Sequence, residues 1–151
     1  LDPSHLTAQE KTQVREQIDR YHRWYDLIHC GHYHRLNELS AQGDYIAWQF
    51  VDKAGDRALV NLVVTHTRAN THGEHLWLRG LRPDSIYRLE EICFEGRQIV
   101  LESASLDNAT AMDRVFSGAS LMYAGYTIPP MQGDYPSVQL LFSRIEQAEV
   151  R

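Results

Sequence analysis

The sequence is short of the features that mark several large classes of protein. Its 151 residues include only two cysteines, Cys30 and Cys93. They can form one disulfide bridge at most. This cysteine content is too low for a disulfide framework and favours a reducing compartment. No apolar run approaches the roughly 18 residues of a membrane span. No segment shows the basic, apolar and small-residue regions that follow one another in a signal peptide. We therefore expect a cytoplasmic protein that makes no membrane contact.

Positive charge is neither abundant nor clustered in this chain. Lys and Arg total 15 against 20 Asp and Glu, which gives a formal net charge of −5. The basic residues are scattered, and no run of them would follow a phosphate backbone. The hydrophobic fraction of 43% and the charged fraction of 23% are ordinary for a globular domain of this length. We expect one domain and no nucleic-acid partner.

The common catalytic motifs are also missing. There is no glycine-rich phosphate loop, and Ser117-Gly118 lacks the context of a nucleophile elbow. Glu90 and Glu91 are most simply solvated at the end of a strand. Cys30 would lie at the C-terminus of a helix, where the dipole disfavours a thiolate. The residues assign no catalytic role and imply no cofactor.

Four metal-capable side chains crowd one short stretch: His29, Cys30, His32 and His34. His32 and His34 are two residues apart and would share one face of a strand. However, no CxxC, HExxH or second spaced pair completes a tetrahedral ligand set. We assign no metal site and expect ordinary histidines at the surface or at the edge of the core.

A long amphipathic helix is predicted from Ala8 to Cys30. Thr7 and Glu10 fit a capping box. An apolar stripe then recurs at spacings of four and three, and Trp24 and Leu27 widen it; its members are Val14, Ile18, Tyr21, Tyr25 and Ile28. Gly31 is expected to end the helix in the left-handed conformation. The stripe packs either on the β-region that follows or on a domain outside this chain. The start Leu1-Asp2-Pro3 favours a piece of a longer polypeptide.

After Gly31 the apolar period changes from 3.6 to 2. We expect a turn at 53–56, one helical turn at Ser120–Ala124 closed by Gly125, and a loop or short helix at 104–113. Ile46, Trp48 and Phe50 should share one strand face. Strands are predicted at 33–36, 45–51, 58–65, 75–79, 85–90, 98–101 and 138–145. The fold class is mainly β: an antiparallel Greek-key-like β-sandwich preceded by one long N-terminal α-helix.

Several segments, taken in their order along the chain, resemble the C-terminal part of family 36 glycoside hydrolases, the bacterial α-galactosidases. LRGLRPD at 78–84, followed by YR at 87–88, is similar to the family's LRGLDPDAxYR, and SGASLMYAG at 117–125 is similar to its SGxxLMxxG. The chain departs from the family at His32 and His34 and in the length of 92–113. Further segments that carry the resemblance are YDLI at 25–28, GHYHRL at 31–36, AWQFV at 47–51, RALV at 57–60 and SVQLLF at 137–142.

The resemblance implies two parts: residues 1–30 as the last helix of a preceding (β/α)8 catalytic barrel, and residues 31–151 as a C-terminal β-sandwich. The family is a retaining one that uses two barrel aspartates, and no residue here matches them. The chain is therefore expected to be inactive alone. Its role would be to support the barrel of the same polypeptide and to contribute to subunit contacts in a homo-oligomer. The barrel or subunit interface would be formed by Tyr21, Trp24, Tyr25 and Ile28.

The alternative hypothesis is a carbohydrate-binding module. Aromatic rings stack on sugar faces, and Trp48, Trp77 and Tyr126 are the candidate stacking residues. Exposed coplanar rings would favour this function, whereas buried rings would argue against it.

Overall fold

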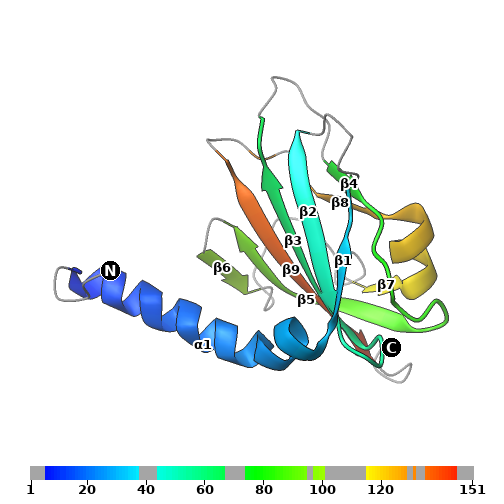
Figure 1. The fold of residues 1–151 in the computed structure, drawn as a ribbon, viewed down its shortest axis with the longest axis horizontal. Helices are drawn as coiled ribbons and strands as arrows, with labels where there is room; N and C mark the ends of the chain where they lie inside the picture. The colour runs from blue at the N-terminus through cyan, green and yellow to red at the C-terminus, as the bar shows by residue number, and fades with distance from the viewer. Residues whose placement is uncertain are drawn as a thin grey trace.

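The computed structural model describes residues 6–37, 44–66, 74–94, 97–100, 115–128, 131 and 135–145. A long helix leads into an antiparallel β-structure, which confirms the predicted fold class (Figure 1). The loop or short helix predicted at 104–113 lies outside the described residues. The elements are α1 (Ala8–Cys30), β1 (His32–Arg35), β2 (Tyr45–Val51), β3 (Arg57–Val64), β4 (Glu74–Leu76), β5 (Ile86–Phe94), β6 (Arg97–Val100), β7 (Val115–Ser117), the π-helix η3 (Ser120–Ala124), β8 (Tyr126–Ile128) and β9 (Ser137–Ile145).

Helix α1 has the bounds that the sequence predicts. The predicted capping box is present, because the Glu10 amide donates to the Thr7 hydroxyl at 3.3 Å while the Thr7 amide donates to the Glu10 carboxylate at 2.7 Å. These bonds satisfy donors that the first helical turn leaves open. Among the described residues, no helix combines the length and the apolarity that a membrane crossing needs.

The end of α1 corrects the expectation for Gly31. This residue is extended, with φ −79° and ψ 173°, and does not enter the left-handed region. Glycine is required there because of close packing instead. A Cβ at this position would collide with the Leu27 carbonyl oxygen and come within 2.7 Å of the Val51 carbonyl oxygen. The helix end is therefore pressed directly against the end of β2.

Among the described residues, seven strands form the main sheet, in the order β1-β2-β3-β9-β5-β6 with β7 paired to β5. Within the described residues, neighbouring strands of this sheet pair antiparallel. The predicted hairpin joins β2 to β3, with Tyr45 opposite Val64 and Val51 opposite Ala58. Strand β3 lies between β2 and β9, and its sequence from Ala58 to Leu62 is buried without interruption.

One face of this sheet carries the main core. Strands β4 and β8 form a small second sheet, which lies with η3 on the same side of the main sheet (Figure 1). Gln49 is fully buried and connects the layers, since its side-chain oxygen accepts from the Arg79 amide at 3.2 Å and its side-chain nitrogen donates to the Arg79 carbonyl. The core includes Ala47, Val51, Ala58, Val60, Leu62, Leu76, Leu78, Tyr87, Leu89, Leu121, Ile128, Val138, Leu140 and Phe142.

The opposite face of the main sheet, here called the outer face, is only partly covered. Ile46, Trp48 and Phe50 share this face, as their alternation predicts, but the main core takes Ala47 and the side chains that alternate with it. Helix α1 covers one row of the outer face through Trp24 and Leu27, which pack on Leu59 with Phe50 and Leu141 beside them.

Some short elements differ from the prediction. The strand expected at 75–79 ends at Leu76, and β7 and β8, of three residues each, were not predicted. The helical turn closed by Gly125 is a π-turn, in which the Gly125 amide donates to the Ser120 carbonyl at 2.9 Å. Gly125 does adopt a positive φ of 83°.

Candidate docking surface

The predicted interface residues of α1 lie on two different sides of the helix. Trp24 is 6% exposed because it faces the chain's own sheet, and Ile28 is half-buried beside it. Tyr21 and Tyr25 are 42% and 48% exposed. Farther towards the N-terminus, Ile18 is 49% exposed. The helix thus uses one side within this chain and leaves a second apolar side open.

The side chains on the open side of α1 contact one another. The Tyr21 ring meets the Tyr25 ring edge-on at 5.8 Å, and Tyr25 stacks on His29 at 4.2 Å. The Tyr21 hydroxyl and the His29 Nε2 are 2.7 Å apart, at hydrogen-bond distance. Residues four apart lie above one another on a helix, so the three rings form a continuous ladder. We call Tyr21, Tyr25 and His29 the aromatic ladder.

The buried side of α1 is reinforced by Arg20, which is 5% exposed. Its guanidinium carbon lies 5.9 Å from the centre of the Trp24 ring, a cation–π distance. The Trp24 ring is consequently enclosed by a cation on its own helix and by apolar side chains of the sheet. The Trp24 side chain is therefore held by contacts with both the helix and the sheet.

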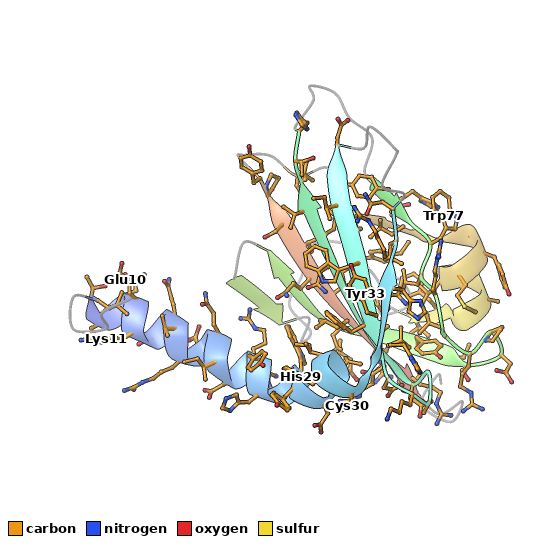
Figure 2. The ribbon with its side chains drawn as sticks, viewed as in Figure 1. Glu10, Lys11, His29, Cys30, Tyr33 and Trp77 are labelled. Carbon is orange, nitrogen blue, oxygen red and sulfur yellow. The ribbon has the colours of Figure 1, made fainter. Side chains whose placement is uncertain are left out.

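The histidines and the cysteine at the junction do not gather into a metal centre. Cys30 is exposed, His29 belongs to the aromatic ladder, and His32 is exposed on β1 (Figure 2). His34 is half-buried, and its pKa is lowered below 6.5 first by burial and then by the charges of Arg79 and His32. Within the described residues, no three His, Cys, Asp or Glu side chains could hold a metal ion together.

A hollow of about 300 Å³ lies where the end of α1 meets the hairpin turn between β2 and β3. Asp26 and Cys30 line it from the helix, and Asp52, Lys53 and Arg57 line it from the hairpin. Arg57 and Asp52 already form an ion pair at 3.7 Å. Two of the charged groups that line this hollow therefore already neutralise each other within the hairpin.

The three candidate sugar-stacking rings belong to different parts of the molecule. Trp77 is 50% exposed beside His75 in the second layer (Figure 2). Trp48 lies on the outer face of the main sheet. Tyr126 packs edge-on against Phe116 and Phe142 at 5.5 Å each, next to the main core. Burial raises the pKa of the Tyr126 hydroxyl. The structure does not bring these rings together into one platform.

Two polar residues of the outer face were not singled out from the sequence. Arg35 and Asn61 flank Trp48 in the register of β1, β2 and β3. A signal for Asn61 exists in the sequence, because it is the only amide in the apolar run ALVNLVV at 58–64. Buried polar groups are expensive unless they are hydrogen-bonded, so an amide in such a run marks a contact to be identified.

Comparison with known proteins gives a consistent result. Residues 45–142 match the model of the glycosyl hydrolase family 36 C-terminal domain. The bifunctional α-galactosidase/sucrose kinase AgaSK of Mediterraneibacter gnavus is 34% identical over 98% of this chain, which covers 14% of that protein. The α-galactosidase Mel36A of Lactobacillus acidophilus is 26% identical over 96% of the chain, which covers 17% of it.

Solved structures agree with these relatives. The galactosidase domain of AgaSK superposes with a TM-score of 0.75 at 33% identity, over 96% of this chain and 17% of that one. The family 36 α-galactosidase AgaA from Geobacillus stearothermophilus gives a TM-score of 0.76 at 27% identity, with the same coverage. The chain therefore spans about one sixth of the proteins that it matches.

Proposed function

Because the chain belongs to the family of glycosyl hydrolase family 36 C-terminal domains, we propose that it is the non-catalytic C-terminal domain of an α-galactosidase. Its role is to support the catalytic part of the same polypeptide. The relatives are named as α-galactosidases, which supports the proposal that the full-length protein containing this chain has that activity. The small share of their length that the chain spans supports the assignment of catalysis to a part outside it.

One observation carries the structural role: α1 bears an ordered but open apolar side. Tyr21 and Tyr25 are held in the aromatic ladder and are still about half exposed. Apolar surface and rigid aromatic side chains are typical of protein contacts, since little entropy is lost when they bind. The proposed partner of this side is the catalytic barrel. In the same proposal the parent is a cytoplasmic homo-oligomer.

The test uses the full-length α-galactosidase that contains this chain. The double variant Tyr21→Ser/Tyr25→Ser should lower its unfolding temperature, because it removes contacts between the two parts. The matched control is Tyr123→Ser, since Tyr123 is 74% exposed on η3 and makes no contribution to the ladder. Equal, small shifts for both variants would reject α1 as the contact.

A deletion tests the wider role. Removal of residues 32–151 from the full-length protein should reduce thermal stability and alter the assembly state measured by size-exclusion chromatography with light scattering. Unchanged stability and assembly would contradict the supporting role.

The alternative function, carbohydrate binding through Trp48, Trp77 and Tyr126, is not favoured by their placement. A sugar ring needs an accessible aromatic face, and these residues lie on separate parts of the molecule.

A further inference from the structure

The outer face contains one polar row that runs across four strands. Arg35 of β1 lies opposite Trp48 of β2, Trp48 lies opposite Asn61 of β3, and Asn61 lies opposite Gln139 of β9. Directly opposed residues in antiparallel strands share a face of the sheet. We call these four residues the donor row, because each carries at least one N–H group on its side chain.

The hydrogen bonding within the donor row is incomplete. Gln139 Nε2 donates to the Asn61 Oδ1 at 2.8 Å, which satisfies the oxygen of the Asn61 amide. Asn61 is only 5% exposed, and among the described residues its Nδ2 has no acceptor. The buried Nε of Arg35 is in the same position. Buried donors are nearly always paired in native proteins, so these two groups mark a place where acceptors from outside the described residues are expected.

A small hollow opens beside the unpaired amide. Its volume is about 160 Å³, and it is lined by Trp48, Asn61, Val63, Ser137 and Gln139, with Leu62 and Val138. The described residues contribute no charged side chain to its lining. Sites for complete small-molecule ligands usually enclose about 300–1,000 Å³. This hollow is smaller, and its size suits one inserted side chain or a short backbone segment of a protein partner.

The surroundings of the donor row are apolar and open. Tyr33 is 59% exposed and Ile46 is 44% exposed on the same face. Tyr33 lies on β1, away from the second layer that carries Trp77 (Figure 2). The adjacent row, Phe50, Leu59 and Leu141, is already covered by α1. The open part of the outer face is thus continuous with the helix.

We propose that the donor row docks on the catalytic part of the same α-galactosidase polypeptide, through a segment that inserts a carbonyl or carboxylate acceptor beside Asn61. This inference rests on the proposed function, and it adds a second contact to that of α1. The chain spans only 14–17% of its curated relatives, so a large partner is available in one polypeptide. Because α1 packs on the adjacent row, a body that covers α1 reaches this face.

Hydroxyl-radical footprinting of the full-length enzyme, read by mass spectrometry, tests the contact without mutation. Oxidation rates in native protein are normalised to rates in urea. Tyr33 should be oxidised several-fold more slowly than Trp77 and Tyr123, the exposed controls of the second layer and η3. Because Tyr33 is 59% exposed within this chain, such slow oxidation requires another body to cover it. Trp48, which is already half-buried in this chain, should be oxidised slowly as well. Fast oxidation of Trp48 and Tyr33 overturns the contact, even where slow oxidation of Tyr21 and Tyr25 upholds the role of α1. Fast oxidation of all four residues rejects both.

The same measurement separates other occupants. Protection of Trp48 that requires added melibiose or raffinose would replace the protein partner by a sugar. Protection that disappears when oligomers are diluted to monomers would replace it by a second copy. Either result overturns the proposal, whereas protection that is independent of sugar and of concentration supports it.

The variant Asn61→Asp tests the acceptor. It keeps an oxygen for Gln139 and replaces the free donor by an oxygen, which repels a carbonyl or carboxylate. The oxidation rate of Trp48 in the full-length variant should rise towards that of Trp77, while the rates of Trp77 and Tyr123 stay unchanged and report an intact domain. An unchanged Trp48 rate rejects an acceptor from the catalytic part and indicates that solvent satisfies Asn61.

Discussion

The strongest single test of the packing of α1 is Trp24→Ala. Trp24 is 6% exposed and packs with Leu27 on Leu59, while Arg20 lies over its ring. Truncation of a buried tryptophan to alanine costs about 3–5 kcal/mol through lost transfer energy and the cavity left behind. The lost cation–π contact adds about 0.5–1 kcal/mol. We expect the upper part of this range, because Arg20 is itself buried and would lose its covering ring.

The assay is unfolding of the 151-residue chain in urea, followed by circular dichroism so that removal of an indole does not change the probe. For a chain of this size the combined loss of about 3.5–6 kcal/mol corresponds to a fall in Tm of roughly 7–24 °C. Tyr25→Ala is the matched control, one position along the helix, and should cost within about 0.5 kcal/mol because its ring is half exposed. Equal effects of the two variants would mean that α1 does not dock on this sheet.

Three further predictions concern the same chain. Gly31→Ala should lower the free energy of unfolding by about 1–3 kcal/mol in urea melts, because its Cβ meets two backbone oxygens; an unchanged midpoint would refute the close packing. Tyr87→Phe removes a buried hydroxyl that donates to the Gly55 carbonyl and accepts from the Arg82 amide, and should cost about 1–3 kcal/mol. The lowered pKa of His34 means that the unfolded chain binds its proton more readily, so stability due to this group falls as pH drops below about 6.5. In urea melts, the free energy of unfolding of the wild type should therefore decrease relative to that of His34→Asn as the pH falls through this range, and a constant difference would refute the reasoning.

The sequence predicted α1 to the residue because two independent signals coincide. The capping box fixes the start, and the end of the apolar period marks the end, although Gly31 follows the helix for its close packing and not as the expected left-handed cap. The sequence could not predict which side of the helix meets the sheet. Trp24 and Tyr25 are neighbours on the helical surface, and both are large and apolar. Only the packing on Leu59 separates the buried ring from the exposed one.

The strands show the same limit in another form. Alternation placed Ile46 and Trp48 on one face correctly, but it does not say which face is inside. The side chains that face the main core are Ala47, which is smaller than Ile46 and Trp48, and the amide Gln49. Gln49 is accommodated there because the second layer lies close enough to β2 for its side chain to hydrogen-bond the backbone of Arg79. Strands of three residues, such as β7, are too short to show a period at all.

The side of α1 that is buried and the face of β2 that is buried could not be predicted for the same physical reason. That reason also explains why the candidate surfaces were only partly predicted. An apolar residue that packs within the chain and one that awaits a partner have the same composition and the same spacing. They differ in exposure, as Trp24 and Tyr25 do, or in an unmet hydrogen bond, as at Asn61. Helix α1 stabilises the outer face on one side and leaves the aromatic ladder open on the other. Within this chain the helix packs on the β-structure, and in the proposed full-length protein its open side contacts the barrel, so both arguments depend on the same element.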